Sequence, residues 1–123
     1  MAKTAVVVVD DDAPITAVVS DILAEEGLRA LACTNGAEAY TAIQRERPYL
    51  VILDLQMPLV DGVQVFQQLR AHPATATTPV IFLTANAHIL EQRLPTYRDM
   101  GAQLLRKPFA LDDLVAAITR ALH

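Results

Sequence analysis

The sequence predicts an α/β fold: a doubly wound, five-stranded parallel sheet in the strand order 2-1-3-4-5, with helices on both faces. Three observations predict it. Short apolar runs alternate along the chain with stretches of helical periodicity, as in successive βαβ units. The runs are continuous and rich in valine, isoleucine and leucine, which is typical of parallel strands buried on both faces. Because crossovers between parallel strands are right-handed, only a few arrangements of such a sheet remain.

The first half of the chain contains two of these units. The first strand is predicted at 5–9, where an alanine and four valines precede three aspartates. An amphipathic helix should follow, between Pro14, which suits a first helical turn, and Gly27, which suits the position after a helix end. A weaker strand is expected at 28–33, and a second helix after the Asn35-Gly36 turn.

The third and fourth strands each end at a polar residue. The third is predicted at 50–53 and ends at Asp54, and the fourth is predicted at 80–83 and ends at Thr84. The helix between them should begin at Asp61, because aspartate is a favoured N-cap residue.

The last part of the chain is less regular. Residues 86–100 have a helical pattern interrupted by Pro95, and an interior proline costs about 3 kcal/mol, so a kink or two short pieces are expected. A short fifth strand at 104–106 ends at Lys107, and a final amphipathic helix is predicted at 111–122.

The predicted strand order is the flavodoxin-like one, in which a ligand site lies at the carboxyl ends of the strands near the topological switch point. We expect residues 1–123 to form one domain, because this length and a hydrophobic content of 53% suit a single core.

Composition excludes several classes of protein. The net charge of −4 and a pI near 5.2 argue against direct nucleic-acid binding. No apolar run is long enough to span a membrane, and residues 1–4 lack the layout of a signal peptide. The single cysteine, Cys33, is expected as a small buried hydrophobe in a reducing compartment, so we expect a cytoplasmic protein. The three histidines, His72, His88 and His123, show no metal-binding spacing and are expected at the surface.

Five polar residues follow the four neighbouring strands and should meet in one cleft: Asp10, Asp11, Asp54, Thr84 and Lys107. Clustered carboxylates repel each other, so such a cluster needs a cation. Oxygen ligands without histidine or cysteine favour Mg²⁺ or Ca²⁺, and Mg²⁺ suits a site with few carboxylates, waters and a phosphate oxygen.

This set of groups suits phosphoryl transfer, in which catalysis is positioning and electrostatic stabilisation. A carboxylate can be the nucleophile and form an acyl phosphate, a role we assign to Asp54. Asp11 would hold the metal, and Asp10 would act through the metal's water shell. Thr84 and Lys107 would bind the phosphoryl oxygens.

The chain resembles the receiver domains of two-component response regulators over essentially its whole length. The resemblance lies in segments that each stand at a strand end, in the family's order: Val8-Val9-Asp10-Asp11-Asp12, Leu53-Asp54-Leu55-Gln56-Met57-Pro58 with Asp61-Gly62, Pro79-Val80-Ile81-Phe82-Leu83-Thr84-Ala85, Gly101-Ala102 and Lys107-Pro108-Phe109.

The resemblance implies a signalling receiver rather than an enzyme with its own substrate. Such a domain takes a phosphoryl group onto Asp54 from the phosphohistidine of a sensor histidine kinase or a histidine phosphotransfer protein. It implies Mg²⁺ bound by Asp11, Asp54 and the backbone carbonyl of Gln56, and a cis Lys107-Pro108 bond. It also implies a conformational switch read by an output partner or domain, with a phosphorylation-dependent homodimer as a further possibility.

The chain departs from the family pattern at the switch. Leu104 stands where the family usually has an aromatic that responds to inward movement of the Thr84 hydroxyl. The unusual 86–100 segment leads us to expect a non-standard partner or dimer face. Tyr97 and Arg106 are candidates for the output face, with ordinary exposed surface as an equal alternative.

Three other functions compete with this interpretation. A haloacid-dehalogenase-type phosphohydrolase also uses an aspartate nucleophile with Mg²⁺, but it needs a second aspartate where this chain has Gln56. A flavodoxin-type binding module needs a phosphate loop after the first strand, where the three aspartates would repel phosphate. A degenerate receiver that binds partners without phosphorylation is disfavoured by the complete acidic set.

Overall fold

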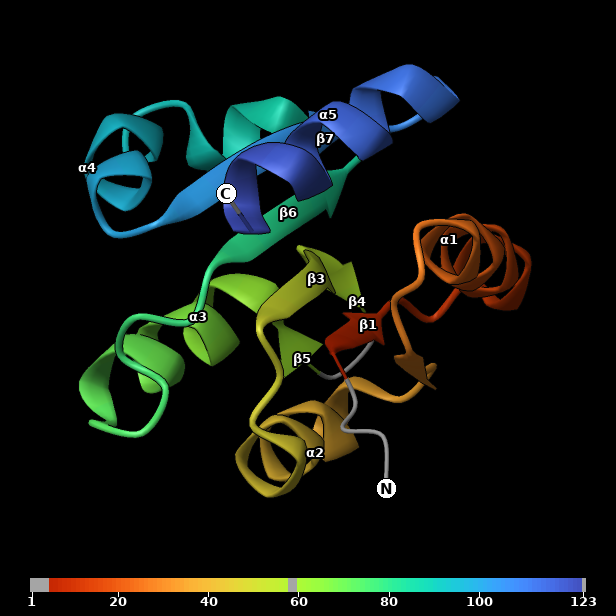
Figure 1. The fold of residues 1–123 in the computed structure, drawn as a ribbon. Coiled ribbons are helices and arrows are strands. Elements are labelled where there is room, and N and C mark those ends of the chain that lie inside the picture. Colours follow the sequence, from red (N-terminus) through yellow and green to blue (C-terminus); the bar gives the residue numbers. More distant parts are fainter. Residues whose placement is uncertain (1–4, 58–59, 123) are drawn as a thin grey trace.

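The computed structural model describes residues 5–57 and 60–122 and contains the predicted five-stranded parallel sheet (Figure 1). Its order is β2-β1-β3-β6-β7, which is the predicted 2-1-3-4-5 once the small hairpin β4–β5 is set aside. The strands are β1 (Val6–Val9), β2 (Ala30–Cys33), β3 (Leu50–Asp54), β6 (Val80–Thr84) and β7 (Ala102–Arg106), and the hairpin is β4 (Gln56–Met57) with β5 (Val60–Asp61).

The helices follow the predicted alternation, and two of them begin at aspartates, of which Asp61 is the predicted cap. Asp12 caps the first helix by accepting a hydrogen bond from the Ile15 N–H, and Asp61 caps the third by accepting from the Val63 N–H. The α-helices are α1 (Ala13–Glu25), α2 (Ala39–Glu46), α3 (Gly62–Ala71), α4 (Leu94–Asp99) and α5 (Leu111–Leu122), with short 3₁₀ turns η1 (Gly36–Glu38) and η2 (Ala87–Leu90).

Helices cover both faces of the sheet and bury two hydrophobic layers (Figure 1). On one face, α1 and α5 pack against alternate strand residues such as Val8, Ile52 and Leu83. On the other, α2, α3 and α4 pack against the intervening ones, such as Leu53 and Phe82. The three central strands β1, β3 and β6 are therefore buried on both faces, which explains their uninterrupted apolar sequences.

The segment after β6 divides into two short pieces, as its proline predicted. They are η2 and α4, joined by a turn, and Pro95 lies in the first turn of α4 rather than inside a longer helix. This position suits proline, because its missing N–H would have no partner within the helix there.

Two expectations need correction. Tyr97 was a candidate for exposed surface, but its side chain is buried, with 7% of the residue accessible to solvent. Its ring packs 4.8 Å from that of Phe66 and 6.3 Å from that of Phe82, and its hydroxyl accepts a hydrogen bond from Gln67. The fifth strand begins at Ala102, two residues before the predicted start, because pairing with β6 extends past the apolar run.

Other expectations agree with the described residues. Cys33 is buried, whereas His72 and His88 are exposed. None of the helices within 5–57 and 60–122 is long and apolar enough to cross a membrane. The expectations for residues 1–4, Pro58 and His123 lie outside the described part of the chain.

Candidate phosphoryl-acceptor site

The sheet brings the predicted polar residues to one edge. Asp10 directly follows β1, Asp54 ends β3, Thr84 ends β6 and Lys107 directly follows β7. The strands are paired without large offsets, for example Leu53 with Val9 on one side and with Phe82 on the other. Because the strands are parallel and nearly level, their carboxyl ends place these residues near one another.

Three carboxylates gather at this edge. Asp10, Asp11 and Asp54 each offer an oxygen, and these oxygens all lie within 4.8 Å of one another. Asp10 and Asp54 are buried, with 0% and 4% of each residue accessible, whereas Asp11 is exposed. The cluster therefore combines two buried carboxylates with one that solvent and a ligand can reach.

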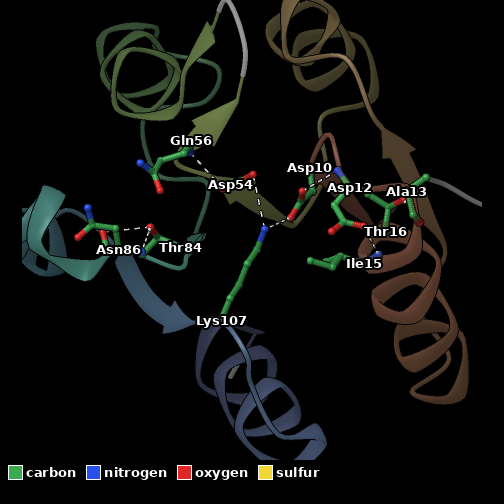
Figure 2. A network of polar contacts seen from close by, with 10 residues as sticks. All are labelled: Asp10, Asp12, Ala13, Ile15, Thr16, Asp54, Gln56, Thr84, Asn86 and Lys107. Carbon is green, nitrogen blue, oxygen red and sulfur yellow. Dashed lines mark hydrogen bonds and ion pairs between the residues drawn. The ribbon is translucent and has the colours of Figure 1, made fainter.

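Lys107 is the cation that faces the two buried carboxylates, those of Asp10 and Asp54 (Figure 2). Its ammonium lies 2.6 Å from Oδ2 of Asp10 and 3.6 Å from Oδ2 of Asp54. Burial by itself would lower the pKa of Lys107, but the hydrogen bond and charge of Asp10, together with Asp54, outweigh burial and raise it. Lys107 is therefore firmly protonated.

The backbone holds both buried carboxylates in place (Figure 2). Oδ1 of Asp10 accepts a hydrogen bond from the Asp12 N–H at 2.9 Å, and Oδ1 of Asp54 accepts from the Gln56 N–H at 3.1 Å. Oδ2 of Asp10 faces the Lys107 ammonium. Each buried carboxylate thus has one oxygen tied to the chain and one directed towards Lys107.

Asp54 is the carboxyl with the perturbed acidity. Its pKa is raised to about 6, mainly by burial. The neighbouring charge of Asp10 also raises this pKa, whereas the hydrogen bond from the Gln56 N–H and the charge of Lys107 lower it. One ammonium therefore does not fully offset two buried carboxylates, and the site has capacity for a further cation.

Thr84 is joined to Lys107 through the backbone, because its carbonyl accepts a hydrogen bond from the Lys107 N–H at 2.8 Å, but its side chain bonds elsewhere. The Thr84 hydroxyl donates to the backbone carbonyl of Asn86 at 3.1 Å and accepts from the Asn86 N–H at 2.9 Å, and Figure 2 shows this pair apart from the ammonium. The Gln56 and Arg106 side chains are exposed, and Leu104 packs at the edge of the core beside Phe82.

One residue that positions Asp54 was not singled out in the sequence. A Cβ atom on Gly62 would lie 2.5 Å from the carbonyl oxygen of Asp54 and 2.8 Å from Cα of Leu55. Only glycine allows α3 to begin this close to the strand end. The Asp61-Gly62 pair by itself indicates a turn and a cap, and the short β4–β5 hairpin before it was not predicted.

Known proteins are similar to this chain in sequence and in fold. The family described as "Response regulator receiver domain" matches residues 6–119. The chain is 35% identical to the DNA-binding transcriptional regulator NtrC of Escherichia coli (strain K12), across 99% of the chain and 25% of NtrC. It is 34% identical to the DNA-binding response regulator MtrA of Mycolicibacterium paratuberculosis, across 96% of the chain and 51% of MtrA.

Solved structures show the same similarity of fold. The chemotaxis protein CheY4 of Vibrio cholerae superposes with a TM-score of 0.85 at 28% identity, covering 98% of this chain and 100% of that one. The chain therefore belongs to the response regulator receiver domain family of two-component systems, which are signalling proteins. It spans between about a quarter and a half of the two curated relatives named above.

Proposed function

We propose that this domain accepts a phosphoryl group on Asp54 and passes the signal on through a change of shape. One observation carries the proposal: the Asp54 carboxylate at the end of β3 lies beside two further carboxylates and 3.6 Å from the Lys107 ammonium. A nucleophile, a cationic group and an oxygen-only set of possible metal ligands are thus adjacent, which is what phosphoryl transfer requires.

The transfer would proceed by attack of an Asp54 carboxylate oxygen on phosphorus. The new O–P bond forms while the bond from phosphorus to the donor's imidazole nitrogen breaks, and the electron pair leaves with that nitrogen. Lys107 would stabilise the charge on the phosphoryl oxygens. The donor is proposed to be the phosphohistidine of a sensor histidine kinase or a histidine phosphotransfer protein.

The donor set fits Mg²⁺. Asp11 and Asp54, with the backbone carbonyl of Gln56, would hold it, and Asp10 would contact its waters. The single ammonium leaves two of the three negative charges uncompensated, and carboxylate and carbonyl oxygens are ligands that Mg²⁺ prefers. When bound, the ion supplies charge compensation for the incoming phosphoryl group.

Thr84 would take part only after phosphorylation. Because its hydroxyl is bonded to Asn86, it must exchange these bonds before it can donate to a phosphoryl oxygen on Asp54. Movement of Thr84 would then change the position of η2 and, across the β6–β7 pairing, of its partner Arg106, which lies two residues after Leu104. We propose that an output partner or domain reads this change, and that residues 1–123 form a single cytoplasmic receiver domain.

The test is incubation with acetyl phosphate, with and without Mg²⁺, followed by measurement of intact mass. We expect one phosphoryl adduct that requires Mg²⁺ and is lost in Asp54→Asn. Asp21→Asn, which changes an exposed carboxylate on α1, serves as the matched control and should retain the adduct. An adduct at the wild-type level in Asp54→Asn would refute the assignment, and no adduct in the wild type would indicate a degenerate receiver.

A further inference from the structure

A hollow with a volume of about 460 Å³ lies between β2 and α2. Leu31, Ala32 and Cys33 of the strand line one side of it, and α2 with the turn before it lines the other. None of the residues that line the hollow belongs to the carboxylate cluster around Asp54, so the proposed phosphoryl site does not account for it. Because β2 is an outer strand, the hollow lies at an edge of the sheet.

The outer edge of β2 pairs with no strand of the described residues. The Cys33 carbonyl faces β1, because it accepts a hydrogen bond from the Asp10 N–H at 3.1 Å. Successive residues of a strand direct their N–H and C=O groups to opposite sides, so those of Ala30 and Ala32 are directed away from β1. An unpaired edge of this kind can add a strand from another chain.

The side of the hollow formed by α2 carries one charge at each end. Glu38, the N-cap residue of α2, and Arg45, in its last turn, both line the hollow and are exposed. They are seven positions apart, which is about two helical turns, so they lie on the same face of the helix. Thr41 and Ala42 lie between them, and these small side chains allow another helix to come close.

Both charges have capacity for a partner outside the chain. Within residues 5–57 and 60–122, the Glu38 carboxylate forms neither a hydrogen bond nor an ion pair. Arg45 contacts Glu46 through Nε at 3.2 Å, and in the same part of the chain its two terminal nitrogens have no bonded partner. An exposed ion pair of this kind contributes little to stability, so it does not commit Arg45 to Glu46.

We propose that a second copy of this chain binds at this edge, with β2 antiparallel to β2 and α2 antiparallel to α2 of the other copy. A two-fold interface must be complementary to itself. The two ends of α2 meet this requirement, because Glu38 of each copy then lies opposite Arg45 of the other. A small ion is a poorer occupant, since the hollow carries one charge of each sign.

The arrangement joins the two sheets into one and is independent of Asp54. Because the strands run antiparallel across the junction, the two phosphoryl sites would lie at opposite edges of the joined sheet. The dimer therefore needs no phosphoryl group and no metal. It is tested in EDTA without a phosphoryl donor, so its failure would leave the proposed function untouched.

The experiment is sedimentation velocity of the 123-residue protein from micromolar to millimolar concentration. We expect a reversible monomer–dimer equilibrium that weakens with salt. Glu38→Arg and Arg45→Glu should each raise the dissociation constant of the dimer by about tenfold, because each change places like charges together at both ends of the interface. The double variant, with both changes, restores opposite charges and should return the constant to within about threefold of the wild type.

A second pair of variants tests the strand pairing. Ala32→Pro removes the N–H that points away from β1 and keeps the hydrogen bonds between β1 and β2. It should be monomeric, whereas Ala32→Ser keeps that N–H and should dimerise like the wild type. Circular dichroism checks that each variant is folded, and the charge exchange tests the interface independently of the proline variant.

The matched controls reverse exposed charges that lie outside the hollow. Arg106→Glu and Glu91→Arg should leave the dissociation constant unchanged within about twofold. Three results would overturn the proposal: a wild-type protein that stays monomeric at millimolar concentration, a double variant that dimerises no better than the single variants, or a folded Ala32→Pro that still dimerises. An equal loss in Arg106→Glu would assign the dimer to a surface that contains β7 and would also overturn it.

Discussion

The Lys107 ammonium is paired more closely with Asp10 than with Asp54, at 2.6 Å against 3.6 Å. The buried carboxylate of Asp10 therefore holds Lys107 in place. The longer distance means that the Asp54 oxygen forms a weaker ion pair with the same ammonium. A group proposed as a nucleophile benefits from this arrangement, because a tight ion pair would have to be broken before it could react. The pairing also makes Lys107 the main compensation for buried negative charge.

Replacing Lys107 should destabilise the domain. Lys107→Met leaves two buried carboxylates without their cation, and breaking such a pair costs about 3 kcal/mol. Urea unfolding in EDTA at pH 7.5 measures the loss, and added Mg²⁺ should recover part of it. Arg106→Gln, one residue earlier and exposed, should change stability by less than about 0.5 kcal/mol. A Lys107→Met protein as stable as the wild type would show that the cluster is compensated by other means.

Asp54 should make stability fall as the pH rises. The pKa of Asp54 is about 6 in the folded protein, against an ordinary value of 3.8 for the unfolded chain. The folded state therefore binds the proton of this carboxyl more tightly than the unfolded state does. Stability from this group is present below about pH 4 and is lost as the pH rises through 6, amounting to about 3 kcal/mol.

The variant Asp54→Asn isolates the contribution of the Asp54 carboxylate to the pH dependence of stability. In EDTA at pH 7.5, Asp54→Asn should be more stable than the wild type by up to about 3 kcal/mol, and the difference should shrink at pH 5. Urea unfolding of both proteins at the two pH values measures it, with Asp21→Asn as control. Equal stability of Asp54→Asn and the wild type at pH 7.5 would mean that the surroundings do not destabilise the charged form of Asp54.

Gly62→Ala should disturb the position of Asp54. Its Cβ would collide with backbone atoms of Asp54 and Leu55, which cannot rotate away, so we expect a loss of about 3 kcal/mol and a slower phosphoryl uptake. Gly27→Ala is the control for loss of a glycine, because its Cβ would meet no atom within 4 Å and only its φ of +77° opposes it. That strain should cost about 1 kcal/mol and leave uptake unchanged. If both variants take up phosphoryl equally fast, the contact does not position Asp54.

Tyr97 should behave as a core residue. Tyr97→Ala removes a ring packed against Phe66 and Phe82 and should cost about 3 kcal/mol, whereas Tyr97→Phe loses only the hydrogen bond from Gln67 and should cost about 1 kcal/mol. Chemical denaturation measures both changes. Met100→Ala, at an exposed position on the turn after α4, is the control and should be nearly neutral. A neutral Tyr97→Ala would place the ring outside the core.

In the irregular segment after β6, the sequence pattern predicted the break in the helix but not which residue is buried. Pro95 predicted two short pieces, because the geometry of proline is local. The burial of Tyr97 could not be predicted in the same way. A six-residue helix has too few turns to define an apolar face, and Tyr97 is buried because α3 and β6 present Phe66 and Phe82 to it.

The sequence by itself determined the sheet, its strand order and the residues at its carboxyl edge. The reason is that continuous apolar runs and helical periodicity are local properties, and parallel strands bring their ends together. Only the tertiary structure decided which of those residues touch. The preference of Lys107 for Asp10, the pairing of Thr84 with Asn86 and the close approach of Gly62 to Asp54 depend on how the elements pack and where each loop runs. Such distances are set by packing, which no local pattern records.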